Sequence, residues 1–336
     1  MRRLKRYICL VGLLALLAAA LTGCGFSDDS VEELFTLPRM AEEYTGLTQE
    51  LETLITQGYE YASPTGGRNI QSVQMADLDG DGQQEALAFF RMSSDEKPLK
   101  IFVFKIEGDS YARYCTIESS GTAIDSVYYQ DLNGDGRREL IVGWRISAEV
   151  QTVAVYTVAR EPVALMSSGY TRFTIQDLNG DGIPSLLVLR TDADSQPVAE
   201  FYGWQEEQMG VAYRCVLSST MASVNRGSLV SGRLDADTPA LYITGVDEQG
   251  MAATDILVFR QDLGLVNLAL SGSSTGVSNA VFPYRQLLPQ DINGDGIIEL
   301  PSPDTSWTAE QTDGLVSWLC CNGDGQLSTV AKTYHS

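Results

Sequence analysis

The sequence predicts an all-β protein made of five repeats, preceded by a short helix. A nine-residue loop, clearest at residues 131–139 (DLNGDGRRE), recurs at 77–85, 177–185 and 291–299, with a worn copy at 233–237. We call these the first to fifth loops in chain order, the worn copy being the fourth. Their first positions lie 54, 46, 56 and 58 residues apart, and each step is long enough for four short strands with turns.

The residues on both sides of the loops have strand patterns. Before the first three loops, apolar side chains alternate as in half-buried strands, at Val73, Met75, Val127, Tyr129, Phe173 and Ile175. Apolar runs of buried-strand type follow at 86–90, 140–144 and 186–189. Third and fourth strands are predicted at 99–105 and 111–117, at 199–204 and 211–217, and at 315–319 and 327–331. The repeated unit is therefore strand, loop, strand.

The loops carry oxygen side chains at positions 1, 3 and 5, with glycines that permit a tight turn. Such a set can surround a hard cation that prefers six to eight oxygen ligands, and calcium is the natural candidate. These positions are Asp77, Asp79, Asp81, Asp131, Asn133, Asp135, Asp177, Asn179, Asp181, Asp291, Asn293 and Asp295. Position 7 would offer only its backbone carbonyl, at Gln83, Arg137, Ile183 and Ile297. Position 9 would complete the shell with Glu85, Glu139 and Glu299, whereas the third loop has Ser185 there.

Two other interpretations of the loops compete with this one. An EF-hand requires a bidentate glutamate at position 12 and flanking helices, but position 12 is Ala88, Val142, Val188 or Ser302. Plain hairpin turns are the second alternative, since Asn-Gly and Asp-Gly favour tight turns without any metal. We prefer this alternative for the fourth loop, and it stays open for the third.

With these loops, residues 69–336 resemble the FG-GAP or VCBS repeat family, whose D-x-[DN]-G-D-G-x-x-[DE] loops join two strands within each blade. The match is close in the first, second and fifth loops, weaker in the third and nearly lost in the fourth. The resemblance implies a five-bladed β-propeller of four-stranded blades that is stabilised by structural calcium.

The start of the chain is typical of a lipoprotein. Basic residues at 2, 3, 5 and 6 precede an apolar run from 8 to 21, which predicts a signal peptide over 1–23. Leu-Thr-Gly-Cys24 resembles a bacterial lipobox. This implies that Cys24 is diacylated and that the protein is extracytoplasmic, anchored to the bacterial cell membrane by its N-terminal lipid. An ordinary cleavable signal is the alternative. Residues 24–37 form a short acidic tether.

An amphipathic helix is predicted over 38–58. Its apolar stripe consists of Met40, Tyr44, Leu47, Leu51, Leu54 and Ile55. We expect this stripe to dock on the repeats, and a partner-binding or self-associating helix is the alternative. Gly46 weakens an isolated helix, and Gly58 is a typical stop signal.

Charge argues against nucleic acid as a partner. Loss of the signal removes four basic residues and no acidic ones, which leaves 19 Lys and Arg against 44 Asp and Glu, a net charge of −25. Such a surface repels nucleic acid and anionic lipid.

Residues for catalysis are scarce. His335 is the single histidine, which argues against histidine triads and histidine-rich zinc sites. The tryptophans 144, 204, 307 and 318 are more typical of blade cores than of sugar platforms. No disulfide scaffold is predicted, although Cys115 and Cys215 are expected at matching positions of two repeats.

The sequence therefore predicts a binding module for a protein or a glycan rather than an enzyme. The alternative is a carbohydrate-active enzyme, a glycosidase or lyase, working with carboxylates in the propeller channel.

Overall fold

The structure is a computed structural model that describes residues 42–250, 252–268, 288–303, 314–321 and 326–335. The predicted signal peptide, Cys24, the acidic tether, the beginning of the predicted helix and Trp307 lie outside these ranges. The chain divides into two compact units, Met1–Thr45 and Gly46–Ser336, and nearly all described residues belong to the second. Among them, every helix is too short or too polar to cross a lipid bilayer.

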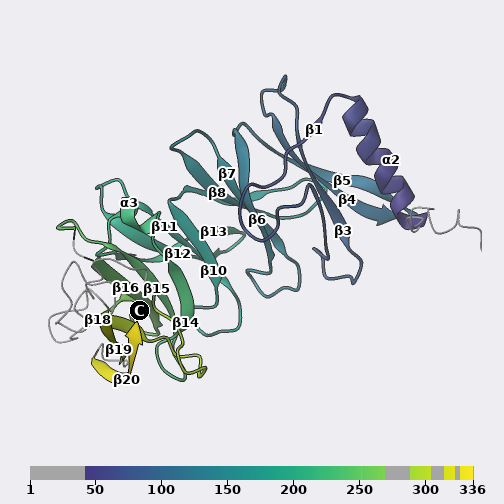
Figure 1. Cartoon of the computed structure of the whole chain (residues 1–336). Coiled ribbons are helices and arrows are strands. Elements are labelled where there is room, and N and C mark those ends of the chain that lie inside the picture. Colours follow the sequence, from purple (N-terminus) through teal and green to yellow (C-terminus); the bar gives the residue numbers. More distant parts are fainter. Residues whose placement is uncertain (1–41, 251, 269–287, 304–313, 322–325, 336) are drawn as a thin grey trace, which may run out of the picture. The chain divides into compact units, whose positions relative to one another are not determined.

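The described residues fold mainly into antiparallel sheets (Figure 1). The first sheet contains β1 (Glu60–Tyr61), β2 (Val73–Ala76), β3 (Glu85–Arg91), β4 (Leu99–Glu107) and β5 (Ser110–Ser119). The second contains β6 (Ala123–Gln130), β7 (Glu139–Arg145), β8 (Gln151–Tyr156) and β9 (Ala164–Gly169). The third contains β10 (Arg172–Gln176), β11 (Ser185–Thr191), β12 (Pro197–Gln205) and β13 (Gln208–Val216).

Two further sheets follow a short helix, α3 (Met221–Val224). The fourth sheet contains β14 (Leu229–Arg233), β15 (Pro239–Val246), β16 (Ala252–Arg260) and β17 (Gly264–Asn267). The fifth contains β18 (Leu300–Pro303), β19 (Gly314–Cys321) and β20 (Leu327–His335). In the described part of the chain, the strands thus fall into five sheets that follow one another in sequence order.

The predicted strand, loop, strand unit is confirmed in the first three sheets. The residue before each loop pairs with the residue at loop position 9, and these closing pairs are Ala76 with Glu85, Gln130 with Glu139 and Gln176 with Ser185. An isolated antiparallel bridge joins Gln290 to Glu299 in the same relation. The fifth loop therefore has the same closing pair, although the residues before Leu288 are outside the described ranges. Strand β1 was not predicted, and closure into a propeller stays a prediction.

Consecutive sheets pack through apolar clusters. Leu87 and Val142 belong to a cluster from the first and second sheets, and Val153 and Val188 to one from the second and third. Further clusters join the third sheet to the fourth and the fourth to the fifth. Strands that follow the loops are buried on both faces, which explains their nearly continuous apolar sequence.

The helix α2 (Glu42–Thr56) confirms the predicted N-terminal helix, and Met40 of the predicted stripe lies outside the described residues. Leu47 and Leu54 are buried, but Ile55 is 48% exposed, so its assignment to the buried stripe was wrong. A Cβ at Gly46 would overlap the hydroxyl of Ser110 on β5. Gly46 therefore permits a close approach of helix and sheet. Gly58, with φ of 97°, follows the helix as predicted.

Two other predictions concern the tryptophans and the strand cysteines. Trp144 and Trp318 are buried, as core tryptophans should be, whereas Trp204 is half-buried. Cys115 pairs with Val103, and Cys215 pairs with Ala199. Cys215 thus lies two residues further along its strand than Cys115, because the β11–β12 connection pairs Thr191 with Pro197 and is two residues shorter than the β3–β4 connection, which pairs Arg91 with Leu99. The expectation of matching positions was wrong.

Candidate metal centre

The first aspartate of each close copy holds its loop together. Asp131 accepts hydrogen bonds from the amides of Gly134 (2.6 Å) and Gly136 (2.8 Å), one on each carboxylate oxygen. The same two bonds form at Asp77, Asp177 and Asp291. Both glycines have positive φ in each of these loops, 76° and 85° in the second. A residue with a Cβ is strained in that conformation, which explains the repeated Gly-Asp-Gly.

The glutamate at position 9 is buried and crosses the loop. Glu85, Glu139 and Glu299 each accept a hydrogen bond from the amide at position 2, at 2.6, 2.9 and 3.0 Å. Each of these bonds uses one oxygen, Oε2. The other oxygen, Oε1, is left for further contacts at the loop.

Positions 3, 5 and 7 form a second set of contacts. Asp81, Asp135, Asp181 and Asp295 each accept a hydrogen bond from the amide at position 7. In the loops with asparagine at position 3, its amide nitrogen donates to the aspartate at position 5, for example Asn133 to Asp135 at 3.1 Å. These bonds order the loop, so the sequence motif specifies its backbone shape.

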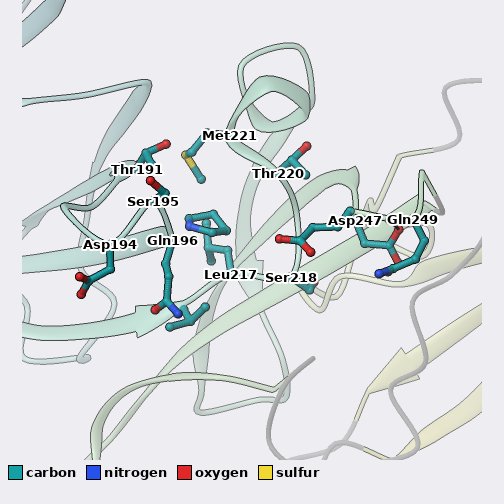
Figure 2. A pocket seen from close by; sticks show the side chains of 13 residues that line it. Thr191, Asp194, Ser195, Gln196, Leu217, Ser218, Thr220, Met221, Asp247 and Gln249 are labelled. Carbon is teal, nitrogen blue, oxygen red and sulfur yellow. Dashed lines mark hydrogen bonds between the residues drawn. The ribbon is translucent and has the colours of Figure 1, made fainter.

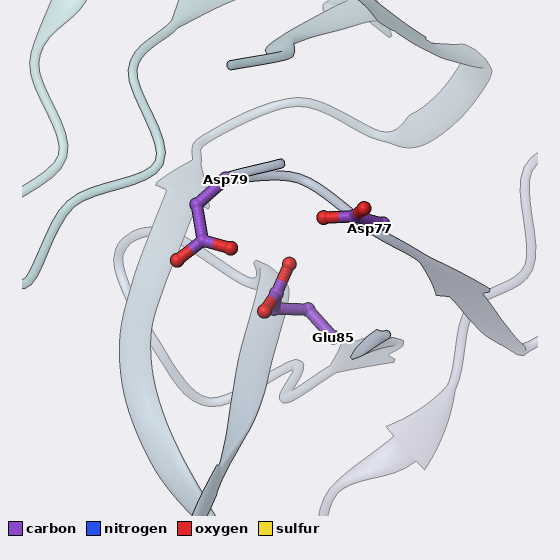
Figure 3. A group of neighbouring side chains, drawn as sticks. All are labelled: Asp77, Asp79 and Glu85. Carbon is purple, nitrogen blue, oxygen red and sulfur yellow. The ribbon is translucent and has the colours of Figure 1, made fainter. Parts of the chain in front are cut away.

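The first loop brings three carboxylates together (Figure 3). One oxygen each from Asp77, Asp79 and Glu85 lies within 4.8 Å of the other two. Across the described ranges, this is the single group of three acidic, cysteine or histidine ligands that meets this distance. Three carboxylates fit a hard divalent cation. The predicted ligand Asp81 is not part of the group.

A lysine that the sequence analysis did not identify also reaches this group. Lys105 on β4 is ion-paired with Asp79, and its Nζ lies 3.6 Å from Oε1 of Glu85. The same ammonium lies 4.9 Å from the ring centre of Tyr114. The first loop therefore has a positive charge supplied by the chain itself.

The two carboxyls beside Lys105 are shifted in opposite directions. The hydrogen bond from Lys105 lowers the pKa of Asp79. Burial raises the pKa of Glu85, with partial compensation from the Leu78 amide and from Lys105. Burial alone would lower the pKa of Lys105, but its bond to Asp79 and the charge of Glu85 raise it. The ammonium is therefore held in its charged form.

The second loop has no such lysine, and its glutamate behaves differently. Burial raises the pKa of Glu139 to about 7, and the nearby charges of Asp135 and Asp131 add to that effect. Asp131 is partly desolvated, but four backbone amides outweigh this and lower its pKa. Backbone bonds, foremost from Gly296, also lower the pKa of Asp291 in the fifth loop.

The fourth loop differs from the others in shape. Asp235 accepts hydrogen bonds from the amides of Asp237 (3.1 Å) and Thr238 (2.9 Å), and Arg233 donates to the Ala236 carbonyl. This is a short turn held by its own side chains. The third loop keeps the backbone of the close copies but carries no acid at position 9.

Three pairs of consecutive loops contact each other. The amide of Arg138 in the second loop donates to the Leu78 carbonyl in the first, at 2.7 Å. A Cβ on Gly134 would lie 2.8 Å from Ile183 of the third loop. The fourth and fifth loops share two backbone bonds, between Arg233 and both Gly296 and Ile298.

A pocket of about 590 Å³ lies beside the first two loops. We call it the loop pocket, and its walls include Asp79, Asp135, Arg137, Thr157 and Trp204. The indole nitrogen of Trp204 donates to the Leu132 carbonyl at 2.8 Å, which fixes the ring against the second loop. The pocket thus joins an aromatic surface to carboxylates and an arginine.

A second pocket, of about 540 Å³, lies away from the loops (Figure 2). It is formed by two hairpin turns and by the segment that leads into α3, and its lining residues include Asp194, Asp247 and Glu248. Its lining contains no basic side chain. Hydroxylated or cationic ligands suit such walls better than anions do.

No protein-family model matches the chain, and no curated protein matches it. A rhamnogalacturonan lyase of family PL11 from Bacillus licheniformis is similar in structure, with 15% identity and a TM-score of 0.33 over 59% of this chain and 49% of the lyase. The chain thus spans about half the length of that lyase.

Two Leishmania structures were also found, both with 10% identity. A hypothetical protein from Leishmania major has a TM-score of 0.27 over 83% of this chain and 97% of its own. A GDP-Man-dependent mannosyltransferase, MPT-1 from Leishmania mexicana, has a TM-score of 0.21 over 86% and 94%. At these TM-scores, the similarities assign neither a family nor an activity to the chain.

Proposed function

We propose that this chain is a lipid-anchored, calcium-stabilised extracytoplasmic β-propeller that binds a protein or a glycan. The observation that carries the proposal is the acidic group of Asp77, Asp79 and Glu85, placed in a loop whose backbone recurs in two further acidic copies. The five sheets in sequence order support the propeller, since each corresponds to one repeat. The lipid anchor rests on the sequence around Cys24.

The role proposed for calcium is structural. In the second and fifth loops, the ligands would be the aspartates at positions 1 and 5, the asparagine at position 3 and the buried glutamate at position 9. Burying that glutamate is costly while it is charged, and a bound cation offsets the cost. Extracellular calcium modules often bind at about 10⁻⁴ to 10⁻³ M, so each site should add about 0.4 to 1.4 kcal/mol at roughly 1 mM calcium.

Thermal unfolding with calcium and with chelator tests this role. We expect calcium to raise the unfolding midpoint of the parent, and less so in Asp135→Ala and Asp295→Ala. Asp235→Ala is the matched control, because it removes an aspartate from the fourth loop, which has the shape of a plain turn. If chelation leaves the parent's midpoint unchanged and calorimetry detects no calcium binding, the loops are hairpin turns without metal.

The loop pocket is the ligand site that we propose. Trp204 offers an aromatic surface for a sugar ring or an apolar side chain, and Arg137 with the carboxylates offers polar contacts. A glycan array and pull-down from envelope extracts, each with parent and Trp204→Leu, test the two ligand classes. If the parent and Trp204→Leu bound a ligand equally well, the loop pocket would not be the binding site of that ligand. Calcium-dependent unfolding of Trp204→Leu reports separately on the fold.

The anchor has its own test. Expression in bacteria with a labelled fatty acid should label the parent but not Cys24→Ser. Equal labelling of the two would remove the anchor from the proposal.

A carbohydrate-active enzyme is the second candidate, and the carboxylates of the Figure 2 pocket favour it. Carboxylate pairs can cleave glycosidic bonds without a histidine. Release of reducing sugar or of unsaturated products from a polysaccharide panel would support this candidate, provided that Asp247→Asn abolishes it while unfolding at the same temperature as the parent.

A further inference from the structure

We propose that Lys105 is a tethered counter-ion of the first loop, which competes with calcium for Asp79 and Glu85. This inference rests on the calcium role proposed above and changes its outcome at one site. By number of carboxylates, the first loop, with four, should bind calcium more tightly than the second and fifth, with three each. Lys105 removes that advantage and keeps the first loop compensated without metal.

The position of the ammonium carries the inference. Its Nζ contacts Asp79 and lies 3.6 Å from Glu85, so it faces two of the three carboxylates that form the acidic group. The Lys105 side chain is 18% exposed, and its Nζ lies over the Tyr114 ring. A cation that binds these oxygens must therefore displace a lysine that is already paired and partly desolvated.

The strand register shows that this charge is particular to the first repeat. The comparison uses the second strand after the first, second, third and fifth loops. On these strands, Phe104 pairs with Ala86, Tyr156 with Leu140, Tyr202 with Leu186 and Leu319 with Leu300. The residues that follow these four partners are Lys105, Thr157, Gly203 and Cys320. Lysine occurs in the first repeat alone among these.

The same position also faces the loop in two other repeats. Thr157 lines the loop pocket together with Asn133, Asp135 and Glu139. In the fifth repeat, burial and the charges of Glu299 and Asp295 raise the pKa of Cys320. The residue equivalent to Lys105 therefore lies near the loop in both repeats. A lysine can thus be removed from this position in one repeat and introduced in another by substitution.

A reciprocal pair of variants tests the inference. Lys105→Met keeps an unbranched apolar side chain of similar length and removes the charge. Thr157→Lys brings a lysine to the equivalent position of the second loop. The matched control is Lys100→Met on the same strand, since Lys100 is buried and likewise paired with two carboxylates, Asp95 and Glu118, but does not contact any of the nine-residue loops.

Calcium titration calorimetry and thermal unfolding in chelator are the two measurements. Lys105→Met should bind calcium at one site on the order of tenfold or more tightly than the parent, because a like charge has been removed from the site. It should also unfold at a lower temperature in chelator and recover with calcium. Thr157→Lys should weaken or abolish calcium binding at one site. Lys100→Met should leave the isotherm unchanged.

An unchanged isotherm for Lys105→Met, in a parent that binds calcium, would overturn the competition. If neither protein binds calcium, the proposed calcium role fails, and the chelator measurement alone decides the counter-ion role. A lower midpoint for Lys105→Met than for the parent then supports it, and an unchanged midpoint overturns it.

Discussion

The first and second loops share a backbone but differ in their charge balance. Both have an aspartate that binds two glycine amides, a glutamate that crosses the loop, and two glycines with positive φ. They differ at position 3, which is Asp79 or Asn133, and at one position of a neighbouring strand, which is Lys105 in one repeat and Thr157 in the other. The nine-residue motif therefore determines the loop geometry, whereas the charge balance of the loop also depends on a residue outside the motif.

The largest expected difference between the two loops is in their response to pH without calcium. Burial raises the pKa of Glu139 to about 7, from an ordinary value of 4.5. The folded state then holds this proton more tightly than the unfolded state, so stability falls as pH rises through that window. Glu139 should contribute a loss of roughly 1 to 3 kcal/mol between pH 5 and pH 8. Urea unfolding in chelator measures it.

Two glutamine variants provide the contrast for this prediction. Glu139→Gln keeps an acceptor for the Leu132 amide and should remove most of that pH-dependent loss. Glu85→Gln should change the pH profile less, because Lys105 already offsets part of the burial cost at Glu85. Equal pH profiles for the two variants would contradict the difference in charge balance between the loops.

Lys105→Met makes the charge balance of the first loop resemble that of the second, and a double variant with Glu85→Gln tests whether Lys105 and Glu85 interact. Lys105→Met alone should cost about 1 to 2 kcal/mol in chelator at pH 8, because Asp79 and Glu85 lose their shared partner. Adding Glu85→Gln should restore part of that loss, since one of the unpaired carboxylates is then neutral. Chemical unfolding of the four proteins in this cycle gives the coupling energy. Additive effects would show that Lys105 and Glu85 do not interact.

The third loop can be used to add the missing glutamate. Ser185→Glu places a carboxylate at position 9, where Glu85 and Glu139 stand in their loops. Without metal we expect a loss of about 1 kcal/mol, because the new charge is partly buried. With calcium, the midpoint should recover and calorimetry should show one additional site. A loss that calcium does not reverse would indicate that the third loop is a plain turn.

The smallest expected effect is at position 3 of the second loop. Asn133→Asp gives this loop the four carboxylates of the first without its lysine. It should lower stability in chelator by about 0.5 kcal/mol, as one more like charge is added at a partly exposed site. Calcium affinity should rise. Asn179→Asp in the third loop is the control, because that loop lacks the glutamate.

Much of the fold could be predicted because strand pattern and loop motif agree. Strand β2 forms where Val73 and Met75 alternate, although its buried residues are Gln74 and Ala76, and the apolar run 86–90 after the loop forms the buried strand β3. Ile55 was misplaced because spacing alone placed it at the edge of the helical stripe, and contact with the sheet ends before that edge. Strand β1 was missed because two residues carry no periodicity.

The candidate site was predicted less completely. The loop residues were identified from spacing, and the structure brings Asp77, Asp79 and Glu85 together. Lys105 was missed because it belongs to another strand, and only the pairing of β3 with β4 brings it to the loop. The contact of Trp204 was missed for the same reason, since Trp204 belongs to the third sheet and hydrogen-bonds to the second loop. Contacts between distant segments depend on register, which a motif does not contain.

The residue Leu78 takes part in two loops at once. Its amide donates to Glu85 in the first loop, and its carbonyl accepts from Arg138 in the second. Any ligand that draws Glu85 inward moves the backbone of Leu78, to which the second loop is bonded. Occupancy of one loop should therefore change the affinity of the next, and by linkage the influence is reciprocal. Successive repeats would then respond to calcium as coupled sites, and the concentration at which one fills would depend on the state of its neighbour.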